Sequence, residues 1–397
     1  MTDGHPLISR LAAAQLLTSI GDGAVLAVSA LYFTTVVGIP AQLVAVGLST
    51  GAAVGLFTTV PFGVLLDRIG APRALLIASA AAVLGLVVFA FAQHAVAYVV
   101  GCVLFACGQG ALAAGRQAVV ATAVGPQQRV RARALLHTAV NLGLGAGSAA
   151  AALLFVLGDG PWGVLVFPAD AVLFVIAACL YVRQGIAATA SRPRGLPALR
   201  DSRYVGLTLL AAVTQLTMPI LSVLIPVWVV TRNDGPAWIP AMVLLANTLI
   251  VVAIQIPVSR RIRDSRTAGR SLWVAGGSIL AACLLFGAAG LNGTGAAMAG
   301  LALLAALLLT VAEVTASAGS WYLAFALAAD THQGQYQALF GTSTALSRII
   351  GPVALVPLVL ATGALGWTLI GLAMCAASAA LVAMTRAHSR QAVALAG

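Results

Sequence analysis

Five ionisable residues interrupt long apolar stretches of this 397-residue chain, and they are the residues best suited to do chemistry. They are Asp22, Arg116, Asp170, Glu313 and Arg348. A charged side chain at the centre of a bilayer costs about 2.5–3.5 kcal/mol on insertion scales, so each one needs a reason. Burial favours a neutral carboxyl, whereas a nearby arginine favours the ionised form. An acid and an arginine that move relative to each other can therefore load and release a proton.

Asp22 is the strongest candidate for carrying a proton or contacting a substrate. It lies midway along the first apolar segment, between Gly21 and Gly23, and the two glycines let another group approach closely. The alternative for Asp22 is a structural ion pair with Arg116 inside the N-terminal half. Because Arg116 lies in the inner half of its segment, its long side chain can also extend to the nearer membrane surface.

Glu313 and Arg348 are the corresponding candidates in the C-terminal half. Arg348 shortly precedes Gly351-Pro352, and it can pair with Glu313 or hold an anionic substrate. Asp170 is a weaker candidate, because we expect it in the outer half of its segment, where it can reach the outer membrane surface. We therefore assign proton coupling or substrate contact to Asp22, Glu313, Arg348 and Arg116.

Uncharged polar and aromatic side chains inside the segments are a second group of candidates. Amides can bond a ligand or a neighbouring helix, and interhelical bonding is the commoner role of any single amide. Aromatic rings offer a flat apolar surface to an organic ligand. The candidates for lining a substrate cavity are Tyr32, Gln215, Asn247, Trp321 and Tyr322.

No grouping typical of an enzyme or a metal centre occurs in the sequence. We find no paired carboxylates, no His/Asp grouping and no phosphate-binding loop, and the five cysteines lie far apart inside apolar stretches. The formal charge of +11 is not accompanied by basic patches interleaved with aromatic residues, which argues against a nucleic-acid partner. We therefore expect no enzyme activity, no cofactor, no metal and no nucleic acid.

These candidates must be positioned by helices that lie in a membrane. The chain is 61% hydrophobic and only 8% charged, whereas soluble proteins carry about 25% charged residues. No cleavable signal peptide is expected, because no small-residue cleavage site follows the first apolar run. A spanning helix needs roughly 20 apolar residues, and the apolar runs are continuous rather than alternating. The pattern predicts an all-α integral membrane protein with twelve transmembrane helices near 8–33, 41–66, 73–93, 96–123, 134–158, 162–183, 204–231, 237–259, 271–290, 295–328, 336–361 and 364–385.

The arginines predict how the chain is oriented in the membrane. All 21 basic residues are arginine, and with both termini in the cytoplasm only Arg232 falls outside, while Arg116 and Arg348 lie within spans. Such a bias is typical of cytoplasmic loops, so we expect a multi-pass protein of the cell membrane with both termini cytoplasmic. An aromatic belt is expected at the outer ends of the helices, formed by Trp162, Trp228, Trp238 and Trp367.

The twelve segments divide into two halves of six. A polar connection at 184–203, which we expect to be a cytoplasmic loop, separates an N-terminal bundle at 1–183 from a C-terminal bundle and short tail at 204–397. The second segment of each half contains a proline and then an arginine-bearing turn, at 61–73 and 257–264. Parallel repeats of this kind create a substrate cavity at their interface.

The first of these turns has the pattern Gly63-x-Leu65-x-Asp67-Arg68-x-Gly70-x-x-Arg73. Gly63 permits close approach of another helix, Gly70 permits a tight turn, and Asp67 can accept hydrogen bonds from a helix N-terminus or an arginine. The pattern resembles the loop 2–3 signature of the major facilitator superfamily. The resemblance implies two six-helix pseudo-repeat bundles, and a cytoplasmic latch formed by Gly63, Asp67, Arg68, Gly70 and Arg73.

The resemblance also implies a function. Drug exporters of the superfamily carry an arginine shortly before a Gln-Gly pair in the fourth helix, whereas here Gln109-Gly110 lacks that arginine. We expect a secondary transporter that exports small apolar organic compounds, such as drugs or natural products, in exchange for protons by alternating access. The alternative is a facilitator or symporter for a sugar, siderophore or other metabolite. The expected partners are this substrate, protons and the lipid bilayer, and we expect a monomer.

Overall fold

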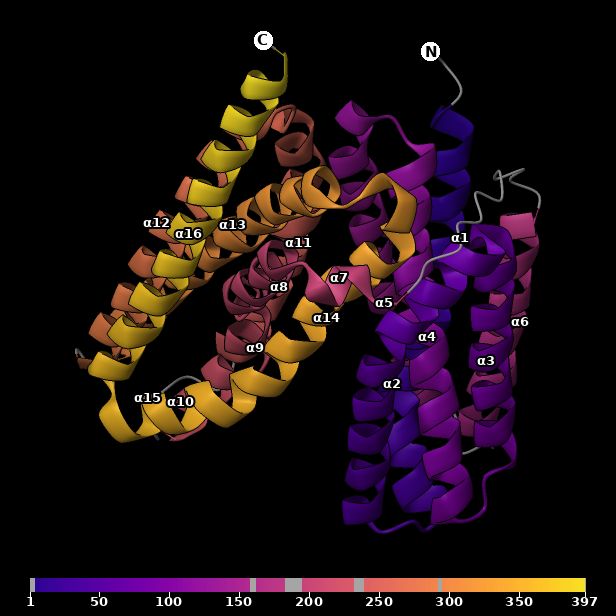
Figure 1. The fold of residues 1–397 in the computed structure, drawn as a ribbon. Helices are drawn as coiled ribbons and strands as arrows, with labels where there is room; N and C mark the ends of the chain where they lie inside the picture. The colour runs from indigo at the N-terminus through magenta and orange to yellow at the C-terminus, as the bar shows by residue number, and fades with distance from the viewer. Residues whose placement is uncertain (1–3, 158–161, 183–194, 232–238, 292–294, 397) are drawn as a thin grey trace. The chain divides into compact units, whose positions relative to one another are not determined.

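The computed structural model describes residues 1–397 without 1–3, 158–161, 183–194, 232–238, 292–294 and 397, and within this described part it is helical with no strand (Figure 1). The all-α fold class is therefore confirmed. Most of the central connection expected at 184–203 lies outside the described residues, as do Arg232 and Trp238 and the side chain of Trp162.

The first part of the chain forms helices that run side by side (Figure 1). They are α1 (Gly4–Leu31), the π-helical segment η1 (Tyr32–Val36), α2 (Ala41–Ile69), α3 (Ala71–Phe91), α4 (Ala95–Ala123), α5 (Pro126–Leu157), α6 (Trp162–Val182) and the short α7 (Pro197–Arg200). Within this part, α1 packs on α5 and α6, α4 packs on α2 and α3, and α3 also packs on α6.

The second part begins at Ser202 and contains several interrupted helices. They are α8 (Ser202–Thr214), α9 (Thr217–Pro219), η2 (Ile220–Leu224), α10 (Ile225–Thr231), α11 (Ile239–Arg261), α12 (Ser265–Leu291), α13 (Gly295–Leu327), η3 (Asp330–His332), α14 (Gln333–Ile350), η4 (Gly351–Leu355), α15 (Val356–Thr362) and α16 (Ala364–Ala396). Here α12 packs on α13 and α16, and α11 packs on α13.

The length and composition of these helices suit a membrane. Within the described residues, 11 helical segments are long and apolar enough to cross a bilayer. The remaining predicted span, at 134–158, corresponds to α5, which begins earlier, at Pro126, and includes the arginines of that stretch. Its 32 residues extend about 48 Å at 1.5 Å per residue, which is more than a bilayer core requires.

Two predicted spans are not the single helices that the apolar pattern indicates. The span at 204–231 is divided into α8, α9, η2 and α10, and the span at 336–361 is divided into α14, η4 and α15. Proline explains both interruptions, because Pro219 directly precedes η2 and Pro352 lies in η4, and neither can donate a backbone N–H to the helix. Single π-helical turns of this kind are frequent at functional sites.

Chain segments from distant parts of the sequence combine into two compact units. One consists of Met1–Arg200 with Ala328–Gly341, and the other consists of Asp201–Leu327 with Thr342–Gly397. The first unit thus includes η3 and the start of α14, which come late in the chain.

The prediction of an aromatic belt is wrong for two of its four tryptophans, Trp228 and Trp367. Trp228 and Trp367 are buried in the core of the second unit, where the Trp367 ring stacks on Phe286 at 4.7 Å between centroids. Trp228 meets both rings edge-on. Both lie near helix ends, but a position near a helix end does not say whether a side chain faces lipid or a neighbouring helix.

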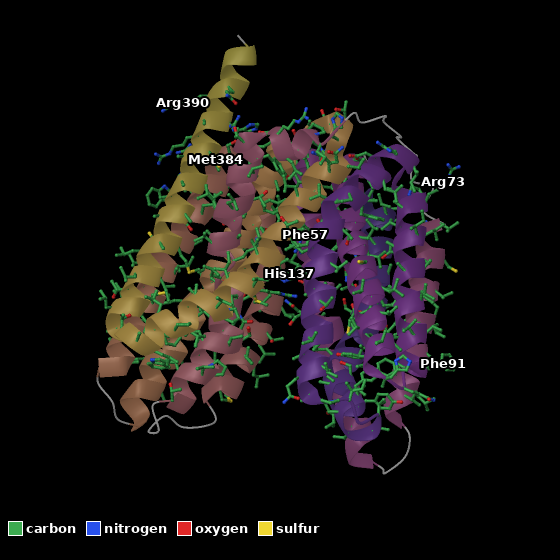
Figure 2. All side chains as sticks on the ribbon, turned by 60° about the horizontal axis from the view of Figure 1, so that its bottom comes forward. Phe57, Arg73, Phe91, His137, Met384 and Arg390 are labelled. Atoms are coloured by element: carbon green, nitrogen blue, oxygen red, sulfur yellow. The ribbon has the colours of Figure 1, made fainter. Side chains whose placement is uncertain are left out.

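Large apolar side chains instead cover the outside of the helices. Phe57 of α2 and Phe91 at the end of α3 are 78% and 79% exposed, and Figure 2 shows both, with Arg73 at the opposite end of α3. A water-soluble protein rarely exposes so many large apolar side chains. This surface fits the hydrocarbon of a bilayer.

Candidate functional site

Asp22 of α1 is half-buried and contacts α4. Its Oδ1 accepts a hydrogen bond from the side-chain amide of Gln109. The sequence pattern marked Gln109 only as part of a Gln-Gly pair, so its role as the partner of Asp22 was missed. A charged acceptor strengthens the bond, and the amide therefore holds the carboxyl in place between the two helices.

Arg116 is buried on α4, two helical turns beyond Gln109. It is the basic neighbour of Asp22, but its Nη1 donates to the hydroxyl of Tyr181 on α6, over 3.2 Å. Arg116 thus donates to Tyr181 and still acts on Asp22 by its charge, so a structural ion pair of Asp22 and Arg116 stays the alternative for Asp22. Arg116 also does not reach the membrane surface, because its side chain is only 4% exposed.

The glycines beside Asp22 admit two neighbouring helices. A Cβ on Gly23 would lie 2.8 Å from Leu144 Cα, so α5 packs against the backbone of α1 there. A Cβ on Gly21 would overlap the carboxyl group of Asp170, which belongs to α6. The close approach expected from the Gly21-Asp22-Gly23 sequence is thus present on both sides.

The prediction that Asp170 reaches the outer membrane surface is wrong. Its side chain is 1% exposed and packs into α1 at Gly21, so it does not extend to a membrane surface. The sequence also showed no paired carboxylates, yet the fold makes Asp22 the acidic neighbour of Asp170. The reason is that 148 residues separate the two acids, and only the packing of α6 on α1 brings them together.

Glu313 of α13 has its polar contacts within the second unit. Asn247 Nδ2 of α11 donates to Glu313 Oε2 over 2.9 Å and also lies 3.1 Å from the Thr310 hydroxyl. Glu313 and Asn247 were predicted separately, one as a charged and one as a cavity residue, and the structure brings them together. Arg348 is exposed and is not the partner of Glu313.

Gln215 lies at the end of α8 and bonds α14. Its Nε2 donates to the Ser343 hydroxyl over 2.7 Å, and its Oε1 accepts from the Thr344 hydroxyl over 2.6 Å. Gln215 therefore uses both ends of its amide to connect the two interrupted spans of the second unit. This arrangement is interhelical bonding, which is the commoner role of an amide in a membrane helix.

The aromatic candidates also contact neighbouring side chains. The Tyr32 ring lies 5.6 Å from that of Phe167, edge to face. The Trp321 ring is buried and lies 5.5 Å from Phe325. The Tyr322 hydroxyl lies 3.1 Å from that of Ser265. These contacts fix the rings in position, and the structure does not group them around Asp22 or Glu313.

Asp67, at the end of α2, bonds the first turn of α14. Its Oδ1 accepts the backbone N–H of Gly334 over 2.7 Å and its Oδ2 accepts that of Gln335 over 3.1 Å. Both amides belong to the first turn of a helix, where backbone N–H groups lack partners inside the helix and the dipole favours a negative charge. Asp67 therefore supplies the cap that α14 needs.

The glycines of this turn make the contact possible. A Cβ on Gly63 would lie 2.6 Å from the carbonyl oxygen of Gly334, so α14 approaches α2 as closely as a glycine allows. Gly70 ends α2 with a φ of 83°, which is strained for any side chain. Arg68 and Arg73 are exposed on either side of the turn.

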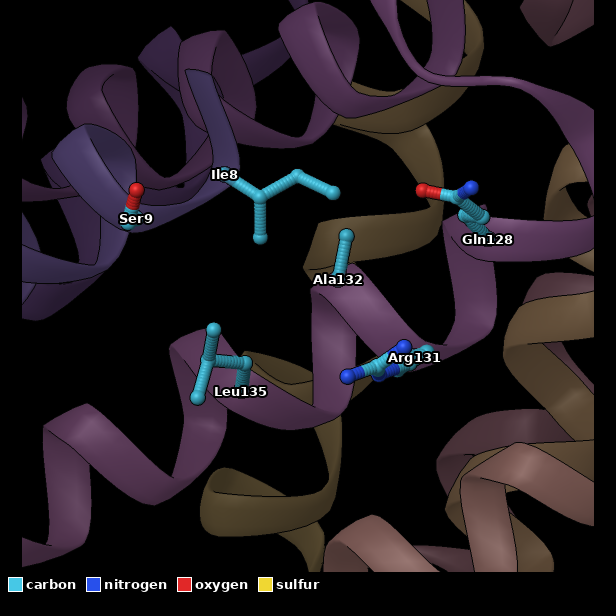
Figure 3. Close-up of a pocket in the computed structure, with 6 residues that line it drawn as sticks. All are labelled: Ile8, Ser9, Gln128, Arg131, Ala132 and Leu135. Carbon is cyan, nitrogen blue, oxygen red and sulfur yellow. The ribbon is translucent and has the colours of Figure 1, made fainter. Parts of the chain in front are cut away.

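A small pocket occurs elsewhere in the first unit. Figure 3 shows it between the start of α1 and the start of α5, lined by Ile8, Ser9, Gln128, Arg131, Ala132 and Leu135. Ile8 precedes Asp22 by about 21 Å along α1, at 1.5 Å per residue. The pocket is therefore separate from the acids, and the described residues contain no group of three or more side chains suited to a metal.

Comparisons with known proteins support a transporter fold. A sequence profile of the Major Facilitator Superfamily matches residues 11–352. No curated protein matches the chain significantly in sequence. A bacterial homologue of the iron transporter ferroportin, in an outward-facing state, has a similar structure, with a TM-score of 0.76 at 17% identity over 96% of this chain and 99% of that one.

Two further solved structures are similar. The human organic anion transporter MFSD10 (TETRAN) gives a TM-score of 0.68 at 17% identity over 96% of this chain and 100% of that one. A variant of the E. coli fucose:proton symporter gives 0.65 at 14% identity over 96% of this chain and 98% of that one. At such identities the likeness establishes the fold, and the named substrates differ among the three.

Proposed function

This chain belongs to the major facilitator superfamily, and on that premise we propose that it exports small, largely apolar organic compounds in exchange for protons by alternating access. A multi-pass membrane transporter, rather than an enzyme, is what membership indicates. The observation that supports proton coupling most directly is one buried or half-buried acid on a membrane helix of each unit. Asp22 and Glu313 each bond a neutral amide rather than an arginine.

A carboxyl that is bonded to an amide can exist with or without a proton. An amide satisfies the ionised carboxylate by donating its N–H, and its oxygen can accept from the protonated acid after a flip. An ion pair with arginine would instead hold the carboxylate ionised. Glu313 therefore has the surroundings expected of a group that changes protonation during a transport cycle. Asp22 shares the amide partner, and its basic neighbour Arg116 donates to Tyr181 instead.

The proposed apolar substrate rests on how few charged residues the chain carries, 8% of the total. Of the two arginine candidates within the predicted spans, Arg116 is bonded to Tyr181. Rings of Tyr32, Trp321 and Tyr322 remain candidates for contact with an apolar substrate. The alternative substrate class, a sugar, siderophore or other metabolite, draws support from the similar fold of a fucose:proton symporter.

We propose that the contact of Asp67 with the start of α14 is the latch of the transport cycle. Charge-assisted hydrogen bonds contribute about 1.5–3 kcal/mol each, which is enough to favour one conformational state over another. We also propose a monomer in the cell membrane with both termini in the cytoplasm. Proteolytic access to a C-terminal tag in inverted, but not right-side-out, vesicles tests this orientation.

Transport in inverted vesicles from cells with and without the protein tests the function. Vesicles energised with a proton gradient are offered a panel of fluorescent hydrophobic dyes, with and without an uncoupler. We expect uptake of at least one dye that the uncoupler abolishes, and a loss of this uptake in Asp22→Asn and Glu313→Gln. Asp264→Asn is the matched control, because Asp264 is an acid at an exposed turn.

Two outcomes would contradict the proposal. Proton-driven uptake that survives in both Asp22→Asn and Glu313→Gln removes the coupling role of these acids. No dye transport, combined with proton-dependent uptake of a sugar or siderophore by intact cells, favours the alternative substrate class.

A further inference from the structure

Asp170 is an unusual buried side chain in the first unit. Its residue is 1% exposed, and neither carboxylate oxygen has a hydrogen-bond partner among the residues that the structure describes. Buried polar groups are almost always bonded, and an ionised carboxylate without a partner is far more costly to bury than a neutral one. The position therefore requires either a proton or a bound cation.

The carboxyl of Asp170 is directed at one place on α1. It fills the space that a side chain on Gly21 would occupy, and the next residue on α1 is Asp22. Asp22 is the ionisable group that acts on Asp170. Two neighbouring carboxyl groups oppose each other's ionisation, because like charges repel.

One charged group on the surrounding helices acts on the pair of acids. It is Arg116 of α4, the basic neighbour of Asp22, and its Nη1 donates to Tyr181 of α6. On α3 the ionisable residue is Arg73, at the first turn. On α1, Arg10 precedes Asp22 by about 18 Å at 1.5 Å per residue. The ionisable residues of α5 are Arg129, Arg131, Arg133 and His137, all in its first half.

We propose that Asp170 and Asp22 share one proton, and that this pair, rather than Asp22 alone, is the proton site of the first unit. A proton taken from water forms an O–H bond on one carboxyl, and that O–H donates to the carboxylate of the other. Release breaks the O–H bond and returns the proton to water. The side-chain amide of Gln109 donates to Asp22 Oδ1 and holds that carboxyl in place. The absence of a side chain on Gly21 leaves room for the Asp170 carboxyl against α1.

The proposal rests on the proton coupling proposed above, but its test does not depend on a transported substrate. Infrared difference spectra of the full-length protein in lipid vesicles, between acidic and alkaline pH, detect the carbonyl stretch of a protonated carboxyl. We expect this band at neutral pH in the unmodified protein. Asp170→Asn and Asp22→Asn should each remove the same component, and Asp264→Asn should leave it unchanged.

A glycine variant keeps the proposal testable if an asparagine variant does not fold. Gly21→Ala retains both acids but places a methyl group where the Asp170 carboxyl lies, so the shared-proton component should shift or vanish. Gly145→Ala is the matched control, because a Cβ on Gly145 of α5 meets nothing within 4 Å. A component that is the same in Gly21→Ala and Gly145→Ala overturns the proposal.

The result is distinguishable from the failure of the proposed function. Suppose that the unmodified protein shows the band, Asp170→Asn lacks it, and dye uptake is the same with and without the uncoupler. The shared proton then stands, and proton-driven export is wrong. If uptake depends on the proton gradient but the band survives in both Asp170→Asn and Asp22→Asn, the pair is wrong and proton-driven export stands. Binding of a metal cation with loss of the band on its addition would also overturn the shared proton.

Discussion

Asp67 accepts the backbone N–H of Gly334 over 2.7 Å, although 267 residues separate the two along the chain. The bond joins the end of α2 to the first turn of α14, and a second bond to Gln335 completes the cap. An isolated helix start is commonly capped by a residue directly before it. Here the cap comes from another helix, so the bond depends on the positions of two elements and can break when they separate.

The variant Asp67→Asn should slow transport while leaving substrate binding nearly unchanged. Asparagine keeps one acceptor oxygen but replaces the other with a donor, which faces the N–H of Gln335 or Gly334. Loss of about 1.4 kcal/mol from the latched state corresponds to roughly a tenfold change in its population or in a rate. Initial uptake rates and dye binding, measured on the same preparation, separate the two effects.

The control for this variant is Asp264→Asn, in the corresponding turn of the second half. Asp264 directly precedes α12 and accepts the backbone N–H of Thr267 in the first turn of that helix, over 2.7 Å, and asparagine is an equally good cap at such a position. Transport at the normal rate in Asp67→Asn, or an equal loss in Asp264→Asn, would contradict the latch.

The variant Asn247→Ala should destabilise the second unit by about 1–3 kcal/mol, because it leaves the buried carboxyl of Glu313 without its donor. The effect should be much smaller in a Glu313→Gln background, since a neutral side chain is less costly to bury alone. Thermal unfolding in detergent of the four proteins of this double-mutant cycle measures the coupling. Equal losses in both backgrounds would show that Asn247 acts independently of Glu313.

The variant Gly351→Ala should destabilise the protein at the contact of its two interrupted spans. A Cβ on Gly351 would lie 2.5 Å from Pro219 Cγ, and the proline ring cannot move away without displacing η2. Overpacking of this kind typically costs about 1–3 kcal/mol. The melting temperature should therefore fall.

Gly341→Ala is the matched control on α14, because a Cβ there meets nothing within 4 Å. Replacing a helical glycine by alanine in open space stabilises a helix by up to about 1 kcal/mol. The two variants should thus shift the melting temperature in opposite directions, and a shift in the same direction would argue against the close contact with Pro219.

Asp264 makes stability at the second turn depend on pH. Hydrogen bonds from the backbone and hydroxyl of Thr267 lower the pKa of Asp264 below its ordinary value of 3.8. An acid whose pKa is lower in the folded state stabilises the fold fully above 3.8, and this contribution is lost as the pH falls through the folded-state pKa.

The variant Asp264→Ala should therefore be less stable than the unmodified protein by about 1 kcal/mol at neutral pH, as for other N-caps. The difference should shrink as the pH falls below about 4, because both proteins then lack the carboxylate. Unfolding in detergent at a series of pH values measures it, and a difference that is constant with pH would mean that the carboxylate is not the stabilising group.

Much of the fold is predictable from the sequence, because a continuous apolar stretch of about 20 residues predicts a membrane-spanning helix. The segments near 41–66 and 96–123 agree closely with α2 and α4. Apolar length does not reveal interruptions, so the breaks at Pro219 and Pro352 had no signal beyond the prolines. It also does not reveal which face of a helix is buried, and for that reason Trp228 and Trp367 were assigned to a belt rather than to the core.

The sequence predicts the individual residues of the candidate site but not which of them contact each other. The glycines around Asp22 correctly indicated a close approach, and a charged residue inside a span is a strong signal by itself. The partners Gln109, Asn247 and Asp170 come from other helices, and only the packing of those helices selects them. Depth along a helix does not predict exposure, and Asp170 is 1% exposed because its carboxyl packs against Gly21 of α1.

The segment Ala328–Gly341, which belongs to the first unit, has a consequence for folding during synthesis. Met1–Arg200 is completed structurally by Ala328–Gly341, so this unit cannot be finished when its own helices have left the ribosome. At about 5–20 residues per second, roughly 7–28 s pass between the synthesis of residue 200 and that of residue 341. During that interval Asp67 has no start of α14 to bond, and a chain stopped before residue 328 leaves its first unit permanently incomplete. Messages truncated before the codon for residue 328 should therefore yield protein that quality control removes.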